Sequence, residues 1–240
     1  MSNTDCGSRL LARHQHILDK LRREIDHISG LGSSAPLPTR EDLRRMSYLQ
    51  LVIKEGMLSP IFAISAHNTK IQSNGKIVLR LYPSVPVNSR EAIRLTTLPV
   101  GGGPDGKSPV LVRPGEGVGY CVYAMHRRKD IYGQDAEEFR PERWEGDSLR
   151  DVGWAYLPFN GGPRLCLGQP CCFFPPMTDE TYYVEEFALL EVAYTVARLV
   201  QVFSKIELPS GEREVKVGQE RQILTLVVAS AEGCVVSLKD

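Results

Sequence analysis

Apolar side chains recur at intervals of three and four residues near the start of the chain, which is the spacing of one helix face. Charged residues such as Arg13, Asp19 and Glu24 fall on the opposite face. This pattern predicts an amphipathic helix over about 8–29. The positions along its inward stripe are Leu10, Leu11, His14, Ile17, Leu18, Leu21, Ile25 and Ile28.

Two further helices are predicted from similar patterns. Thr39 precedes a charged turn and can cap a helix with its hydroxyl, so we expect a helix from residue 40 to Glu55. Its apolar positions are Leu43, Met46, Leu49 and Ile53. A strongly apolar helix is predicted over 186–203.

Short segments with alternating apolar residues predict strands at 92–95, 110–112 and 118–123. Residues 223–229 and 234–238, separated by Ser230–Gly233, predict a β-hairpin. The stretch 126–153 is charged and irregular. The elements together indicate an α+β fold that is mainly α.

Composition narrows the function classes. The chain has 240 residues, 29 basic and 29 acidic side chains and no net charge, which argues against a basic nucleic-acid binder. No run approaches the roughly 18 apolar residues of a membrane span. The N-terminus does not resemble a signal peptide, so we expect a soluble intracellular chain. The six cysteines lack the spacing of a structural zinc site, and we expect neither zinc nor a disulfide framework.

Residues Gly101–Ser108 match the pattern G-x-x-x-x-G-K-S/T of a phosphate-binding loop. That loop works only when a helix begins directly after its lysine and serine, because the N–H groups of the helix terminus then point at phosphate. Here Pro109 and a strand-like run follow. We therefore interpret the segment as a glycine-rich β turn, and a nucleotide-binding protein remains only a remote alternative.

The segment Phe159–Gly168 surrounds a single cysteine with glycines. Glycines allow the backbone to curl tightly around Cys166, and Arg164 can offer a fixed cation to a carboxylate. A thiolate in such a loop suits a haem iron whose propionate groups need a cation. The alternative for an isolated cysteine is a buried structural thiol.

The complete string F-N-G-G-P-R-L-C-L-G resembles the haem-binding signature of the cytochrome P-450 family, F-x-x-G-x-R-x-C-x-G, at every fixed position. Phe139–Trp144 resembles the P-E-R-F/W segment of the family's meander. Lys54-Glu55 and Val78–Pro83 resemble the two halves of its helix-K motif, E-x-x-R followed by L-Y-P. The chain is thus similar to the C-terminal part of that fold, with helices J, K and L, small sheets, the meander and the cysteine loop.

The resemblance implies a role for each matching residue. Cys166 is the expected catalytic residue and axial ligand of the iron of haem b. Arg164 and Arg90 are expected to hold the propionates, and Phe159 to pack near the haem. The cofactor-binding residues implied in total are Phe159, Gly162, Arg164, Cys166, Gly168 and Arg90. A structural triad is implied for Glu55, Arg80 and Arg143, whereas His126 is expected to make a structural polar contact.

Several runs, among them Met125–Gly133, look like those of fungal n-alkane and fatty-acid hydroxylases. The implied reaction is a monooxygenation that hydroxylates the end of a long apolar chain. The implied partner is an NADPH-dependent cytochrome P-450 reductase at the endoplasmic reticulum membrane. Because this chain shows no membrane anchor, we expect it to be cytoplasmic or leave its location unassigned.

Two segments interrupt the family pattern. Residues 56–77 separate Glu55 from Arg80, which should be three positions apart, and residues 170–185 separate the cysteine loop from the last helix. We interpret both as retained-intron insertions, because removing them restores the motifs and keeps the reading frame. If the first insertion opens the charge triad, replacing Arg80 by alanine should add little damage.

The family's helix I, with its A-G-x-D/E-T-T segment, has no match. We therefore interpret residues 1–240 as a partial cytochrome P-450 domain, truncated and inactive as given. The alternative is a non-catalytic, pseudogene-like fragment that binds haem weakly or not at all.

Overall fold

The computed structural model describes residues 7–56, 62–64, 70–73, 79–164, 187–209, 211, 217, 222–224, 228–230 and 234–239. Cys166, Gly168 and the whole of 170–185 lie outside these residues, as does most of 56–77. The mixture of helices and sheets confirms the α+β class.

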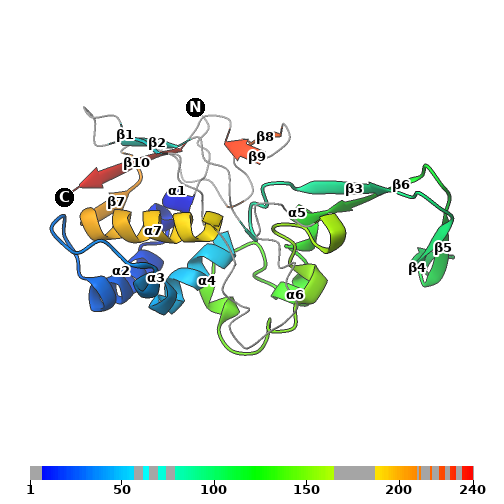
Figure 1. Ribbon diagram of the computed structural model, residues 1–240, viewed down its shortest axis with the longest axis horizontal. Coiled ribbons are helices and arrows are strands. Elements are labelled where there is room, and N and C mark those ends of the chain that lie inside the picture. The colour runs from blue at the N-terminus through cyan, green and yellow to red at the C-terminus, as the bar shows by residue number, and fades with distance from the viewer. Residues whose placement is uncertain are drawn as a thin grey trace.

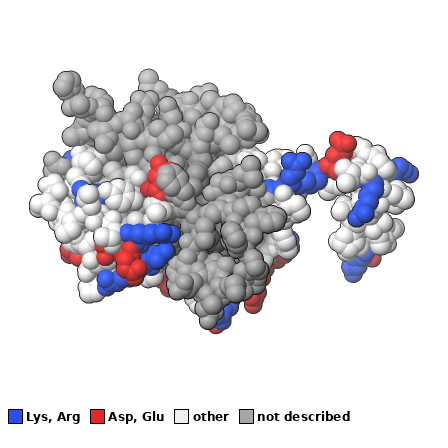
Figure 2. All heavy atoms as spheres, in the orientation of Figure 1, with Lys and Arg blue, Asp and Glu red and all other residues white. Residues whose placement is uncertain are grey.

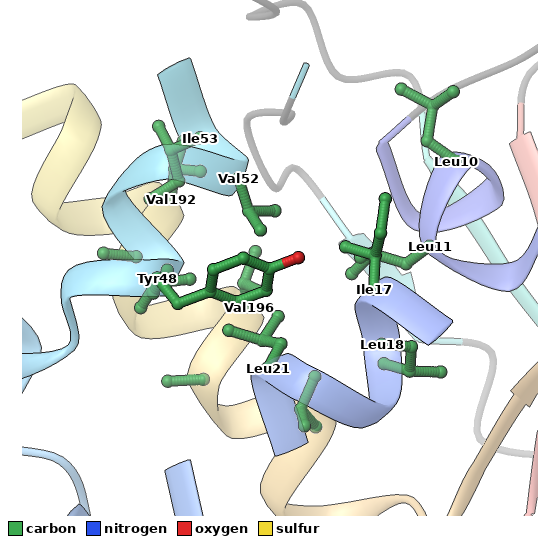
Figure 3. Packing of buried hydrophobic residues seen from close by; sticks show 14 of the residues in the cluster. Leu10, Leu11, Ile17, Leu18, Leu21, Tyr48, Val52, Ile53, Val192 and Val196 are labelled. Carbon is green, nitrogen blue, oxygen red and sulfur yellow. The ribbon is translucent and has the colours of Figure 1, made fainter. Parts of the chain in front are cut away.

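Helices from both ends of the chain form one body in Figure 1. They are α1 (Gly7–Arg13), α2 (Gln15–Ser29), α3 (Arg40–Arg45), α4 (Ser47–Gly56) and α7 (Phe187–Val202). The apolar helix α7 contacts α2, α3 and α4. Leu21 of α2, Val52 of α4 and Val196 of α7 share one buried cluster (Figure 3). Each such side chain contributes roughly 1.5–3 kcal/mol when it leaves water.

The long helices predicted over 8–29 and 40–55 are each divided in two. His14 leaves the helical conformation (φ −109°, ψ 68°), and its ring Nδ1 lies 2.8 Å from the Leu10 carbonyl. Met46 also leaves it, which frees the first turn of α4 to meet the Glu24 carboxylate of α2. That carboxylate accepts from the N–H groups of Tyr48 at 2.7 Å and Leu49 at 2.9 Å. The predicted Thr39 cap is confirmed, and it forms a complete capping box with Asp42.

One antiparallel sheet has the strand order β1-β2-β10-β7. Three pairs complete the described strands: β3 with β6, β4 with β5, and β8 with β9. The bounds are β1 (Phe62–Ile64), β2 (Lys70–Ser73), β3 (Val87–Glu91), β4 (Thr96–Gly102), β5 (Ser108–Val112), β6 (Gly117–Cys121), β7 (Lys205–Glu207), β8 (Gln222–Leu224), β9 (Val228–Ser230) and β10 (Cys234–Lys239). Short helical segments are α5 (Val122–Met125), α6 (Lys129–Tyr132), η1 (Pro141–Trp144), η2 (Gly153–Ala155) and η3 (Gly162–Arg164).

Two strand predictions are wrong. Residues 92–95 lie between β3 and β4, and Ile93 is 92% exposed. The predicted hairpin of 223–229 with 234–238 does not form, because β10 pairs with β2 and β7 while β8 pairs with β9. Residues 118–123 begin as β6 but turn into α5 at Val122.

The strands β3 and β6 lead away from the helical body, and β4 and β5 form a hairpin at their far end (Figure 1). Gly103 and Gly106 both have positive φ, at 74° and 69°, so the glycine-rich segment turns the chain between two strands. The interpretation as a β turn is confirmed, since β5 follows Lys107 where a phosphate-binding loop needs a helix. Figure 2 shows basic and acidic side chains mixed on this arm.

Within the described residues, no helix combines the length and apolar character that crossing a membrane requires.

Candidate functional site

A buried carboxylate joins three parts of the chain. Glu55 at the end of α4 is fully buried, as are Arg80 and, to within 4%, Arg143 of η1. The Glu55 oxygens accept from Arg80 Nη2 at 2.6 Å and Nε at 2.7 Å, and from Arg143 Nε at 2.7 Å. Trp144 Nε1 at 2.9 Å and the Arg140 N–H at 3.1 Å complete the set. The structure therefore brings the predicted triad together, and residues 56–77 do not open it.

The guanidinium groups use their other donors on backbone carbonyls of the irregular stretch 126–153. Arg80 donates to the carbonyls of His126 at 2.9 Å and Glu138 at 3.1 Å. Arg143 donates to those of Tyr132 at 2.6 Å and Asp135 at 2.8 Å. A strand-free segment can lie against the core because these donors satisfy its carbonyl groups.

The single carboxylate of Glu55 faces the guanidinium groups of both Arg80 and Arg143. A second carboxylate is therefore needed nearby to balance their charge. Asp135 contacts Arg143 Nη1 at 3.3 Å and Arg140 Nε at 2.7 Å. Desolvation raises the pKa of Asp135, but the two arginines outweigh it and hold the pKa below its usual range. Asp135 is therefore ionised at neutral pH and shares the positive charge of Arg143.

His126 lies beside this cluster, fully buried at the end of α5. Its Nδ1 is 3.1 Å from the Arg80 carbonyl, and its Nε2 accepts from the Leu157 N–H at 2.8 Å. Desolvation lowers the pKa of His126 to about 4, and the positive charges of Arg80 and Arg127 act in the same direction. The expectation of a structural polar contact is confirmed.

The start of the cysteine loop has a constrained backbone. Asn160 has a positive φ of 67°, and its Oδ1 accepts from the Tyr120 hydroxyl at 2.8 Å and from the Gly161 N–H at 3.0 Å. Gly162 has a φ of 67°, and a Cβ at Gly161 would collide with the ring of Trp154. Two of the glycines are thus required by the geometry of this loop.

The other predicted haem-binding residues fall into two groups. Phe159 is half-buried and packs against the core, whereas Arg164 is exposed at the end of η3. Arg90 on β3 lies over the Tyr120 ring, 5.6 Å from its centroid, and so approaches the loop through the Tyr120–Asn160 contact. Among the described residues, no carboxylate forms an ion pair with Arg90 or Arg164. Neither cation is thus neutralised by a carboxylate of the described residues.

Cys166 and Gly168 lie outside the described residues, and so does the second predicted insertion. In the part of the chain that the structure describes, no group of His, Cys, Asp and Glu is arranged to hold a metal ion. The contributions of Trp144, Tyr120 and Asn160 were not predicted from the sequence. Only Trp144 carried a signal, because it directly follows Arg143 in the P-E-R-F/W segment.

The comparisons with known proteins agree with these features. The cytochrome P-450 family matches residues 9–69 and 78–172. A cytochrome P-450 of Arthroderma benhamiae is 56% identical over 236 residues, which cover 96% of this chain and 39% of that protein. Cytochrome P-450 52A6 of Candida tropicalis is 43% identical over 201 residues, covering 83% of this chain and 31% of that protein.

The chain belongs to the cytochrome P-450 family. Cytochrome P-450 52A3-A of Candida maltosa is a further relative, 45% identical over 199 residues, with 82% of this chain and 31% of that protein covered. The chain thus spans between 31% and 39% of the length of these fungal relatives. Members of the family hold haem iron and receive electrons from NADPH through a reductase.

Replacing Glu55 by glutamine should destabilise the protein by about 3–5 kcal/mol, because Arg80 would then be buried without a counter-charge and Arg143 would keep only Asp135. The free energy of unfolding in urea measures this effect. Asp147→Asn is the matched control, since Asp147 is paired with Arg150 at the surface and should contribute less than about 1 kcal/mol. Equal losses in the two variants would contradict a structural role for the buried cluster.

Stability should also depend on pH through His126. In the unfolded chain its pKa is near 6.5, whereas in the folded protein it is about 4. The unfolded state therefore binds more protons between these values, and stability is lost as the pH falls from 6.5 to 4, by about 3 kcal/mol from this group. Comparing unfolding free energies of the wild type and His126→Gln across this range isolates the contribution, because the variant should lack it.

Proposed function

We propose that this chain forms the cysteine-ligand side of a haem-thiolate monooxygenase. The observation that carries the proposal is the strained, glycine-dependent backbone of Phe159–Arg164, which leads directly to Cys166. The buried charge cluster behind it supports the same conclusion, because it fixes the segments on which this loop rests.

In this proposal Cys166 would supply a thiolate ligand to the haem iron. Phe159 would pack against the haem, and Gly162 and Gly168 would leave room for it. Arg90 and Arg164 bind the propionates, for which a fixed guanidinium is suited. When bound, the haem iron supplies the activation of O2 that allows one oxygen atom to enter a C–H bond.

The substrate class we propose is a long apolar chain such as an n-alkane or a fatty acid, hydroxylated at its end. Support comes from the runs shared with fungal hydroxylases and from the similarity to the two Candida proteins. By the same resemblance, electrons come from an NADPH-dependent reductase at the endoplasmic reticulum membrane. In family terms we assign α2 to helix J, α4 to helix K and α7 to helix L, with the meander and the cysteine loop between K and L.

We further propose that residues 56–77 interrupt one continuous helix. The Leu81 N–H lies 3.3 Å from the Glu55 carbonyl. If the 22 residues are removed, Leu81 is four positions after Glu55 and this contact is an ordinary α-helical hydrogen bond. Arg80 is then three positions after Glu55, where an ion pair on one helix face closes. A transcript in which the codon of Glu55 joins that of Val78 would establish a retained intron.

Residues 170–185 are proposed as a second insertion on sequence grounds alone. Without them, α7 would begin five residues after Cys166 instead of 21. A transcript joining the codons of Gln169 and Glu186 is the corresponding test.

Cys166→Ser should abolish the thiolate-type spectrum of the reduced carbon monoxide complex in haem-loaded protein, because the serine hydroxyl does not supply a thiolate ligand. Cys121→Ser is the control, since Cys121 is free and exposed on β6 and should leave the spectrum unchanged. A thiolate spectrum that survives Cys166→Ser would identify another ligand. A wild-type chain that takes up no haem would favour a non-catalytic fragment.

Deleting 56–77 should raise the free energy of unfolding, because it removes the closure entropy of a 22-residue excursion, a contribution of about 2–3 kcal/mol. Two local costs oppose this gain. Val78 would replace Gly56, whose Cβ position lies 3.1 Å from Phe139 and 3.2 Å from Leu10, and β10 would lose its pairing with β2.

The control is a deletion of 56–78, which differs by one residue. It places Arg80 two positions after Glu55, on the opposite helix face, and should destabilise the protein. Equal stabilities of the two deletions would rule out a restored helix.

A further inference from the structure

His126 joins two segments that are far apart in the sequence. One ring nitrogen meets the carbonyl of Arg80, and the other meets the N–H of Leu157. The His126 carbonyl in turn accepts from Arg80 Nη1 at 2.9 Å. The Tyr156 ring lies 5.3 Å from the imidazole, centroid to centroid. The histidine is therefore bonded to Arg80 twice and to the chain just before the cysteine loop once.

These partners determine the protonation of the ring. A backbone N–H only donates, so Nε2 must offer its lone pair to Leu157. A carbonyl only accepts, so Nδ1 must carry the hydrogen toward Arg80. An imidazolium would direct a second N–H at the N–H of Leu157, while the cations facing the ring, Arg80 and Arg127, would repel it. Only the neutral Nδ1–H tautomer satisfies both contacts.

We propose that His126 is a positioning residue, which holds Leu157 at a fixed place relative to Arg80 and thereby sets the start of the loop Phe159–Arg164. Leu157 is two residues before Phe159, and the neighbouring Tyr156 hydroxyl donates to the Lys54 carbonyl at 3.3 Å. The position of Arg80 is itself set by Glu55. The charge cluster thus determines where the loop begins, and the consequence for haem rests on the proposed function.

The test separates the two ring contacts. The amide of asparagine reaches the place of Nδ1, and that of glutamine reaches the place of Nε2. His126→Gln should therefore keep the Leu157 contact, whereas His126→Asn should lose it. We expect hydrogen exchange at the Leu157 amide to accelerate at least tenfold in His126→Asn and less than threefold in His126→Gln. Equal exchange in both variants would overturn the proposal.

The wild-type chain provides a measurement that does not depend on how the variants fold. The ¹⁵N shifts of the His126 ring should show a neutral Nδ1–H tautomer that does not titrate between pH 8 and pH 5. A Nε2–H tautomer, or a charge acquired in this range, would contradict the proposed bridge.

In haem-loaded protein, the fraction of thiolate-type carbon monoxide complex should fall in His126→Asn and stay near the wild-type value in His126→Gln. If Cys166→Ser shows that the cysteine is not the ligand, the Leu157 exchange still reports the bridge. The His126 bridge and the role of Cys166 as haem ligand can therefore be disproved independently of each other. A thiolate fraction that is unchanged in His126→Asn, with Leu157 exchange accelerated, would show that the bridge does not control the loop.

Discussion

The buried carboxylate of Glu55 is the interaction on which the rest of the described structure depends. An isolated charge in the interior is strongly unfavourable, and here it is tolerated because five donors converge on its two oxygens. The same arginines donate to carbonyls of a segment that contains no strand and whose helices, α6 and η1, are only four residues long. Arg80 and Arg143 thus do two things at once: they neutralise Glu55, and they donate to backbone carbonyls between His126 and Glu138.

This arrangement explains why the cluster survives the interruption of its sequence motif. A helix would hold Glu55 and Arg80 together through its backbone, but the contacts observed are made mainly by side chains. Arg80 is bonded by the carboxylate of Glu55 and by the carbonyls of His126, Ala136 and Glu138. The ion pair between Glu55 and Arg80 can therefore form although 24 residues lie between them in the sequence. The expectation that the excursion would make Arg80 dispensable does not fit this geometry.

The structural features that depend on local spacing were predicted from the sequence. Those that depend on residues far apart in the chain were not. The apolar stripes located the helices, yet the break at Met46 depends on Glu24 of another helix, which no local pattern around Met46 reveals. The strand Cys234–Lys239 was identified but paired wrongly, because its partner β2 lies within the segment read as an insertion. At the site, the motifs named Glu55, Arg80 and Arg143 through a family resemblance, since 25 positions of separation predict no contact. The link from Tyr120 to Asn160 had no signal, because neither residue belongs to a motif that requires the other.

Independent contacts hold the part of the chain that directly precedes Cys166. His126 bonds the chain at Leu157, Tyr120 bonds it at Asn160, and Trp154 lies against Gly161. All of these lie on the N-terminal side of the cysteine. On the other side, α7 begins 21 residues after Cys166 in the sequence, and a helix dipole stabilises a thiolate only near its first turn. The described contacts therefore act on the position of the loop, and they say nothing of the acidity of its thiol. If 170–185 are an insertion, as we propose, their removal would place the start of α7 five residues after Cys166, which is close enough in sequence for the dipole of that helix to act on the thiolate.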